Sequence, residues 1–145
     1  MMNFMCKCAE KYGEHAPLVM RVAVGVIFLA HGYQKWTGGV DNVATFFASA
    51  GIPLAAFFAY LVVYLELFGG ALLILGIFTH WLAKLFAIEM AVAFFFVHAG
   101  KGFFLSNGGY EFVLLLFAAS VSLVITGGGK WALENKFWGM QSEKK

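Results

Sequence analysis

The sequence predicts an all-α membrane protein built as a bundle of four transmembrane helices. Hydrophobic residues make up 61% and charged residues 12% of the 145 residues, and the mean hydropathy is +0.80, whereas roughly a quarter of the residues in a soluble domain are charged. Long apolar runs recur along the chain, and the longest, residues 53–78, contains a single charge at its midpoint. Because the basic residues flank these runs and form no patch, no nucleic-acid partner is expected.

The charge at the midpoint of this run is Glu66. At about 1.5 Å per residue, it would lie near the centre of a hydrocarbon layer about 30 Å thick. An acidic residue there costs about 2.5–3.5 kcal/mol, so we expect Glu66 to face the protein interior and favour a functional role over one that only pins two helices together. Gly69 and Gly70 would let a second backbone or a flat ligand approach the same face.

The first predicted transmembrane helix covers residues 17–36. Pro17 suits the first turn of a helix, while His31 and Lys35 follow near the far end and are four residues apart, so they can share a face. Residues 41–50 predict a short helix, capped by Asp41 and too short to cross a membrane. We expect it to lie at the membrane interface.

The second and third predicted transmembrane helices cover residues 53–78 and 81–98. Only two residues separate them, so we expect antiparallel neighbours. The third helix contains Glu89 near its middle and His98 at its end, and nine residues at about 100° each place these side chains on opposite sides unless the helix is broken. We therefore expect Glu89 to pair elsewhere, with Arg21 or another donor of the cytoplasmic half, in a structural role.

The fourth predicted transmembrane helix covers residues 110–126 and begins at Glu111. A carboxylate interacts favourably with the positive end of a helix, so a capping role for Glu111 competes with a role in a site. The tail, residues 130–145, predicts an amphipathic interface anchor because aromatic residues lie among its lysines, namely Trp131, Phe137 and Trp138.

The basic residues predict the orientation. Eight fall on the side of the termini, Lys7, Lys11, Arg21, Lys84, Lys130, Lys136, Lys144 and Lys145, and two fall opposite, Lys35 and Lys101. By the positive-inside rule, we expect residues 1–145 to form one multi-pass membrane domain with cytoplasmic tails at residues 1–16 and 130–145. The N-terminal tail has no short apolar core followed by small residues, so no cleaved signal peptide is expected. Cys6 and Cys8 would then lie in a reducing compartment and stay free thiols.

Polar residues converge on the outer half of the predicted bundle, above Glu66. Two similar segments, FLAHGYQKWTGG and FFVHAGKGFFLSNGG, place His31 and His98 at matching ends of two helices, where histidine can exchange protons near neutral pH. A position at the lipid headgroups would explain either histidine alone. A divalent metal is a weaker interpretation, because no His-x-x-x-His or Glu-x-x-His spacing occurs, and the phenylalanines near His98 suit a planar apolar ligand better.

Four segments together resemble the DoxX family of small four-helix membrane proteins: RVAVGVIFLAHGYQK, ELFGGALLILG, HAGKGFFLSNGGYE and GGGKWALE. The resemblance implies a four-helix bundle in the inner membrane and an association with quinone-linked redox work, since relatives include membrane subunits of thiosulfate:quinone oxidoreductase. The matching positions are Arg21, Gly25, His31, Gly32, Lys35, Glu66, Gly69, Gly70, Gly76, His98, Gly102, Phe103 and Glu111.

We therefore expect a quinone-binding or proton-relaying membrane subunit of an oxidoreductase system. Glu66, His31 and His98 would be the catalytic residues, and the quinone would be bound by these three with Lys35, Gly69, Gly70, Phe103 and Glu111. No flavin, haem or metal motif is present, so a soluble or membrane redox partner protein would supply the electrons, and assembly with further copies of the chain stays open. The alternative is a non-catalytic membrane scaffold, or a carrier of small solutes or protons.

Overall fold

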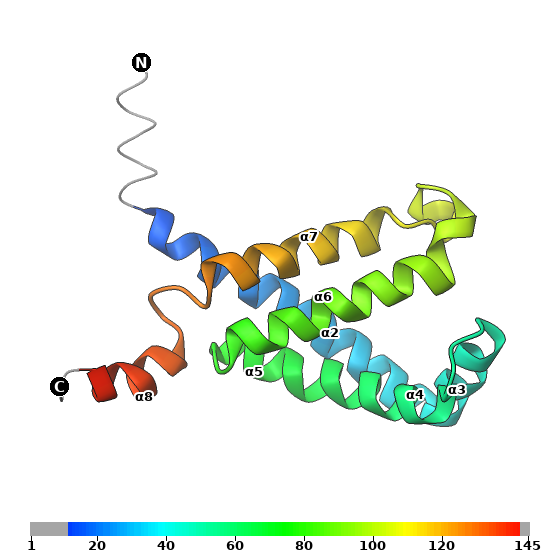
Figure 1. Cartoon of the computed structure of the whole chain (residues 1–145), viewed down its shortest axis with the longest axis horizontal. Helices are drawn as coiled ribbons and strands as arrows, with labels where there is room; N and C mark the ends of the chain where they lie inside the picture. Colours follow the sequence, from blue (N-terminus) through cyan, green and yellow to red (C-terminus); the bar gives the residue numbers. More distant parts are fainter. Residues whose placement is uncertain (1–11, 143–145) are drawn as a thin grey trace, which may run out of the picture.

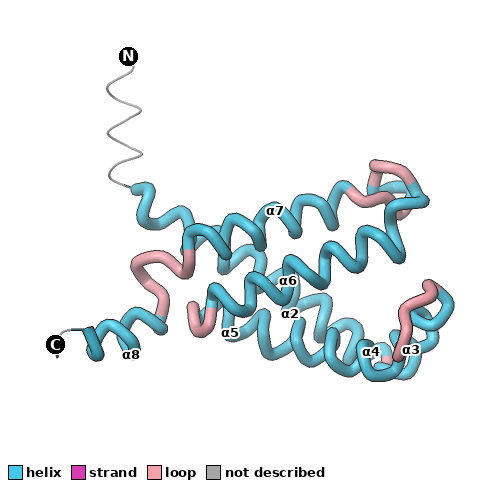
Figure 2. Tube along the Cα trace, viewed as in Figure 1, coloured by secondary structure: helices cyan, strands magenta, loops and turns pink. Residues whose placement is uncertain are grey.

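The structure, a computed structural model, describes residues 12–142, with side chains up to residue 137. Every regular element in this part of the chain is a helix (Figure 2), which confirms the predicted all-α class. Cys6 and Cys8 lie outside the described residues, as do the lysines at the two ends of the chain and the side chain of Trp138.

The first two predicted helices are present. After the short helix η1 (Gly13–His15), α2 (Ala16–Gly38) covers the first, with a proline in its first turn as predicted. The short helix is α3 (Val40–Ser49), but the expected cap is wrong, because Gly39 is the N-cap residue and Asp41 lies within the first turn without capping it.

The longest apolar run forms one continuous helix of three parts: α4 (Ala55–Tyr64), the π-helical turn η2 (Leu65–Gly69) and α5 (Gly70–Leu75). Gly76 ends it with a φ of 71°. The N–H groups of Gly76 and Ile77 donate to the carbonyls of Leu73 and Leu72, the Schellman pattern in which a left-handed glycine closes a helix. The tight turn thus occupies residues 76–78, three residues earlier than the sequence suggested.

The second half of the chain begins with α6 (Thr79–Ala93), which continues into a second π-helical turn, η3 (Phe94–His98). Two short 3₁₀ turns, η4 (Ala99–Lys101) and η5 (Leu105–Asn107), lead to α7 (Glu111–Thr126). A loop through residues 127–132 then joins α7 to α8 (Leu133–Ser142).

The long helices lie along the long axis of the molecule (Figure 1). In the bundle α2 packs against α5 and η2, and α6 packs against α7. The rings of Phe28 and Phe86 stack between these two halves with 3.8 Å between centroids and 11° between planes. The helix α3 and the connection from α6 to α7 lie at one end, here called the α3 end, while the start of α2 and α8 lie at the other.

The end opposite α3 is closed by a buried arginine. Arg21 is 2% exposed, and its guanidinium donates hydrogen bonds to the carbonyls of Ile74, at 2.7 Å, and Trp131, at 2.9 Å. The Glu134 carboxylate accepts the backbone N–H of Thr79. The predicted pairing of Arg21 with Glu89 is therefore wrong, because the arginine instead ties the segment after α7 to the end of α5.

Within residues 12–142, three helices are long and apolar enough to cross a membrane: Gly13–Gly38, Ala55–Leu75 and Thr79–Lys101. The chain is a membrane protein with several apolar helices. The fourth predicted span, α7, has 16 residues and is about 24 Å long at 1.5 Å per residue, which is shorter than the hydrocarbon layer. The fourth crossing therefore stays a prediction.

Candidate functional site

The centre of the bundle contains an ion pair between α2 and η2. The ammonium of Lys35 donates to both carboxylate oxygens of Glu66, at 2.6 and 2.7 Å. The Glu66 side chain is 3% exposed, whereas that of Lys35 is 29% exposed, so the charge at the midpoint of the long apolar run does face the interior, as predicted. The lysine therefore neutralises the buried carboxylate while its own side chain remains partly exposed.

A close approach of α2 to η2 makes this pair possible. A Cβ atom at Gly32 would lie 2.5 Å from the backbone nitrogen of Leu67 and 2.9 Å from the carbonyl carbon of Glu66. Only a glycine leaves room for two backbones at that separation. Since Gly32 precedes Lys35 by three residues, the same face of α2 makes the approach and supplies the lysine.

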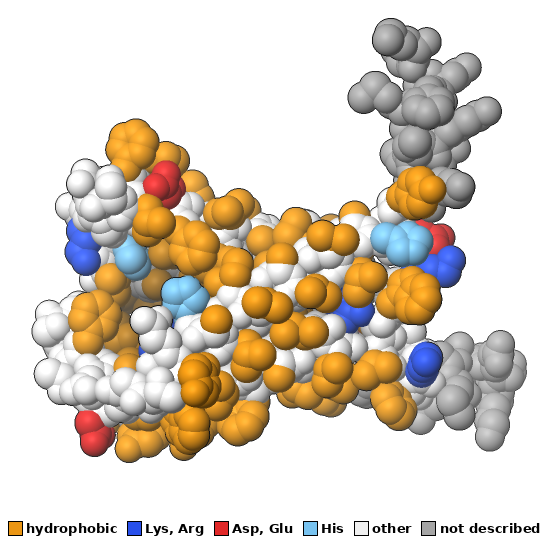
Figure 3. Space-filling view, turned by 180° about the vertical axis from the view of Figure 1, so that it is seen from behind, with side chains coloured by type: hydrophobic (Ala, Val, Ile, Leu, Met, Phe, Trp, Pro, Cys, Tyr) orange, Lys and Arg blue, Asp and Glu red, His pale blue; other side chains and the backbone are white. Residues whose placement is uncertain are grey.

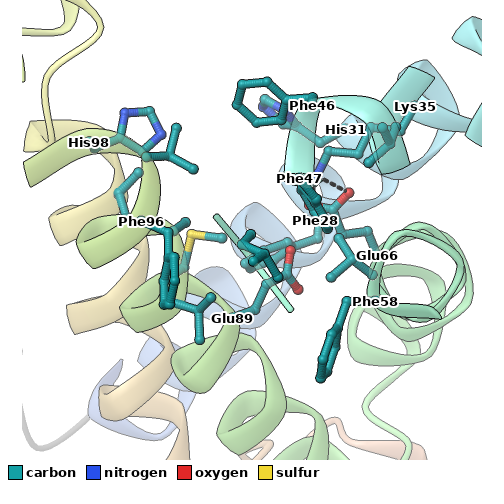
Figure 4. Close-up of a pocket in the computed structure, with 18 of the residues that line it drawn as sticks. Phe28, His31, Lys35, Phe46, Phe47, Phe58, Glu66, Glu89, Phe96 and His98 are labelled. Atoms are coloured by element: carbon teal, nitrogen blue, oxygen red, sulfur yellow. Dashed lines mark hydrogen bonds and ion pairs between the residues drawn. The ribbon is translucent and has the colours of Figure 1, made fainter. Parts of the chain in front are cut away.

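The other intramembrane acid, Glu89 of α6, faces the same centre from the opposite side (Figure 4). Its carboxyl group lies close enough to the Lys35–Glu66 pair to interact with the charges of both. Its Oε2 atom is buried and has no hydrogen-bond partner among the described residues. The expectation of a structural partner elsewhere is thus wrong for Glu89, which joins the candidate site.

The two π-helical turns explain how this comes about. The segment η3 separates Glu89 from His98, and a π-helical turn holds about one residue more than an α-helical turn, which removes about 100° of the rotation between them. The two side chains are then about 80° apart instead of 180°, and both line one cavity. Glu66 itself lies within the other π-helical turn, and such turns occur frequently at functional sites.

Two histidines lie nearer the α3 end of the site. The Nδ1 atom of His98 is 2.7 Å from the carbonyl of Gly108, and because a carbonyl only accepts, Nδ1 carries the proton and Nε2 of the neutral ring keeps its lone pair. His31 lies against Phe112, with ring centroids 6.2 Å apart. The structure brings both predicted histidines to the cavity that Glu66 and Glu89 line.

This cavity has a volume of about 1010 Å³, at the upper end of the range for small-molecule sites. It lies between the α2–α4 side and the α6–α7 side of the bundle, and α3 and the segment after η3 also border it. Figure 3 shows a hollow at this end of the molecule, with histidine side chains beside it. Apart from the charged and polar groups at its inner wall and mouth, its lining is apolar and rich in phenylalanine (Figure 4).

The cavity also extends sideways between α4 and α6. Apolar residues of both helices line this part and are exposed at the surface of the bundle, among them Leu61 at 45% and Ile88 at 61%. In a membrane this surface would meet acyl chains. The cavity is thus open along its flank as well as at its α3 end.

Four of the predicted site residues do not line the cavity. Gly70 packs against the backbone of α2, where an added Cβ would lie 2.6 Å from the nitrogen of Leu29, and Gly69 packs against α6, so both glycines serve helix packing and do not lie where a ring would bind. Phe103 contacts neighbouring rings outside the cavity. The Glu111 carboxylate accepts the N–H of Leu105, which gives it a role in holding the loop before α7.

Glu89 could have been selected from the sequence by a simpler rule. An ionisable residue in the middle of an apolar helix is a functional candidate by default, and the rotation argument that removed it from the site assumed a regular α-helix. Adding Glu89 to the candidate site does not create a metal-binding site. Within residues 12–137, no group of three or more His, Cys, Asp and Glu side chains is arranged to hold an ion.

The fold and the site define a small helical membrane protein with a large, mainly apolar cavity and a buried cluster of one lysine and two glutamates. A family model described as DoxX matches residues 16–99. The chain belongs to the DoxX family. The match extends from α2 into η4, and so includes all the charged residues and histidines that line the cavity except Lys101.

Individual relatives agree with this assignment. A Bacillus subtilis protein named "Putative oxidoreductase CatD" is 36% identical over 125 residues, 86% of this chain and 89% of the relative. An uncharacterized protein of Haemophilus influenzae is 35% identical over 89% of this chain and 96% of its own length. The Escherichia coli inner membrane protein YphA is 38% identical over 48% of this chain and 49% of its own. No solved structure matches the chain significantly.

Proposed function

We propose that this protein is the quinone-binding or proton-relaying membrane subunit of an oxidoreductase system in the inner membrane. The observation that supports this most is the cavity of about 1010 Å³, apolar and lined with aromatic rings, with Lys35, Glu66 and Glu89 at its inner wall and His31 and His98 toward its mouth. The name of the CatD relative points to the same class of activity.

The residues fit such a ligand in shape and in polarity. Aromatic and aliphatic walls favour a planar apolar ring, and the flank between α4 and α6 would let a hydrophobic tail remain among the lipids. A bound quinone accepts two electrons and two protons. In its neutral form His98, whose Nδ1 proton is bound to the Gly108 carbonyl, would accept a hydrogen bond at Nε2 from a hydroxyl group of the reduced ring. His31 would hydrogen-bond to a ring oxygen, and both histidines would exchange protons with the mouth of the cavity.

Electrons would come from a partner protein. The sequence contains no flavin, haem or iron–sulfur motif, so the chain's own side chains would bind, orient and protonate, while a soluble or membrane-bound partner would supply the reducing equivalents. In such an assembly the ion pair of Lys35 and Glu66 would hold α2 against η2 at the inner wall of the cavity. The enzyme would then be the assembly and not this chain alone.

The topology that goes with this proposal has four crossings and both termini in the cytoplasm. The distribution of basic residues supports this topology. Lys35 and Lys101 lie beside the cavity, and the greater number of basic residues belongs to the opposite end, so the positive-inside rule puts the α3 end outside. The helix α7 would complete the fourth crossing beside α6, and α3 would lie at the outer interface with its apolar side toward the bundle.

A scaffold or carrier is the second candidate, and one observation favours it. The Lys35–Glu66 pair is already satisfied and joins α2 to η2, so these residues could serve only to hold the bundle together or to pass protons. In that case substitutions of the pair would unfold the protein without a separate loss of ligand binding, or proton uptake into liposomes would depend on Glu66.

Direct binding tests the proposal. Protein extracted gently in detergent is examined by native mass spectrometry for a co-purified quinone and then titrated with decylubiquinone and menadione. We expect saturable binding in the wild type, weaker binding in His31→Ala and His98→Ala, and unchanged binding in Glu14→Gln, whose exposed carboxylate pairs with Lys130 at the closed end. Absence of quinone affinity in a folded wild type and in Glu66→Gln alike would refute it.

A further inference from the structure

The inner wall of the cavity holds two carboxyl groups and one ammonium group. Lys35 Nζ contacts both oxygens of Glu66, which assigns the ion pair to Glu66 and leaves Glu89 without a cation of its own. Two adjacent buried carboxylates with one cation would leave a net negative charge in an apolar interior, where an uncompensated charge is very costly. One proton on the pair removes this cost.

The other titratable groups around the cavity do not supply the missing cation. His31 of α2 and His98 of η3 lie toward the mouth, and His98 is already bound to a carbonyl. Lys101, from η4, lines the cavity but is an exposed residue. The helix α3 and the bordering part of α7 contribute no charged side chain to the lining, and Glu111 is engaged by the backbone of Leu105.

The geometry of Glu89 shows where that proton would be useful. Its Oε2 atom is buried, without a hydrogen-bond partner among the described residues, and its side chain lines the cavity. An unpaired polar atom in such a position costs free energy unless a ligand satisfies it. A neutral carboxylic acid has a donor to offer there, whereas a carboxylate only accepts.

We propose that Glu89 is a protonated acid that donates a hydrogen bond to the bound ligand, so that the cavity selects a neutral ring bearing an accepting carbonyl oxygen, as in an oxidised quinone. The identity of the ring in this inference rests on the proposed function, whereas the protonation state assigned to Glu89 does not depend on it. Glu66 is then a positioning residue, which holds Lys35 and keeps the proton on its neighbour. The proton-carrying role that the sequence analysis gave to Glu66 is thus assigned to Glu89.

The protonation state is testable without any quinone. Dicyclohexylcarbodiimide is apolar and reacts with protonated carboxyl groups, whose O–H adds across an N=C bond of the reagent to leave a covalent adduct of defined mass. After treatment of the wild type at pH 7 in detergent and then in liposomes, mass spectrometry of the peptides locates the adduct. We expect it on Glu89, with none on Glu66 and none on the loop residue Glu111.

Two substitutions test the donor. Glu89→Gln keeps a neutral group with N–H donors, so decylubiquinone should bind within about threefold of the wild type, while Glu89→Leu removes the donor and should weaken binding about tenfold or more. Both replace a neutral group by a neutral group, so both should keep their gel-filtration profile. Oxidised decylubiquinone should also protect Glu89 from the carbodiimide.

The outcomes separate this inference from the function on which it rests. An adduct on Glu66, or on neither residue, overturns the inference, and so does equal quinone binding by Glu89→Gln and Glu89→Leu. An adduct on Glu89 in a protein that binds no quinone supports the assignment of the proton and refutes the proposed function, and the search would then turn to other carbonyl-bearing apolar ligands.

Discussion

Replacing Lys35 by methionine should destabilise the protein more than replacing Glu66 by glutamine. The Lys35→Met variant leaves a carboxyl group that is 3% exposed, whereas Glu66→Gln leaves an ammonium on a side chain that is 29% exposed and can extend toward the mouth of the cavity. Breaking a buried ion pair by removing one partner costs about 3–5 kcal/mol. We expect this range for Lys35→Met and about 1–2 kcal/mol for Glu66→Gln, because the freed ammonium can reach water or Glu89.

The assay is thermal unfolding of the purified protein in detergent, followed by circular dichroism. At about 2–4 °C per kcal/mol, Lys35→Met should lower the melting temperature by roughly 6–20 °C. The stranded carboxyl group can take up a proton, and a neutral acid is less costly to bury than an anion, so the deficit should be smaller at pH 5 than at pH 8. Lys101→Met removes another lysine that lines the cavity, an exposed one, and should change stability by about 0.5 kcal/mol or less.

The double variant Lys35→Met/Glu66→Leu completes the experiment. Replacing both members of a buried pair by apolar residues is often neutral or stabilising, so the double variant should recover most of the stability that Lys35→Met loses. Two results would refute the reasoning: a loss for Lys35→Met no larger than that for Glu66→Gln, or a double variant as unstable as Lys35→Met. Either would mean that the carboxyl group of Glu66 is not held as an anion by this lysine.

Three further variants test other parts of the structure. Gly32→Ala should destabilise the protein by about 1–3 kcal/mol in thermal unfolding, because the added Cβ would meet backbone atoms of η2. A Cβ added at Gly38 of the same helix would have no atom within 4 Å, so Gly38→Ala should be neutral, and equal effects of the two substitutions would argue against close contact between α2 and η2. Ile88→Trp fills the opening between α4 and α6 at a residue that is 61% exposed, so it should slow or weaken binding of decylubiquinone more than of the tail-less menadione, and an equal effect on both would exclude entry along the flank. Arg21→Gln leaves backbone carbonyls of Ile74 and Trp131 without their donor and should cost at least about 1–3 kcal/mol and speed proteolysis in residues 127–132, whereas unchanged cleavage would show that other contacts hold this segment.

The helices were predictable from the sequence because hydropathy decides them. Apolar runs bounded by Pro, Gly and charged residues marked α2, the α4–α5 helix and α6 to within a few residues, since each must satisfy its backbone hydrogen bonds internally wherever it meets lipid. The capping of α3 was not predictable in the same way. Asp41 suits an N-cap by residue type, but the helix is capped two residues earlier than that role requires, at Gly39 with a φ of 96°.

The candidate site was predictable only in part. Glu66 was identified from the sequence because a lone charge in an apolar helix requires partners when it is buried. The same rule led us to place His31, Lys35 and His98 at one end of the bundle as its possible partners. Glu89 was assigned elsewhere because helix rotation was counted as if α6 were regular. Gly69 and Gly70 were assigned to the ligand because a small residue permits either close helix packing or ligand approach, and only the packing partners, α2 and α6, decide between them.

The π-helical turn η3 (Phe94–His98) has a consequence for how such a site could arise. A π-helical turn accommodates one additional residue without rotating the rest of the helix, so the segments before and after it keep their relative orientation. A single inserted codon could therefore enter this helix while the histidine continued to face the acid on the preceding turns. Deleting one residue from the turn should restore a uniform α-helix in which the histidine and Glu89 are eight residues apart and still separated by about 80°. The two side chains would face apart only if all nine steps of the present spacing were α-helical.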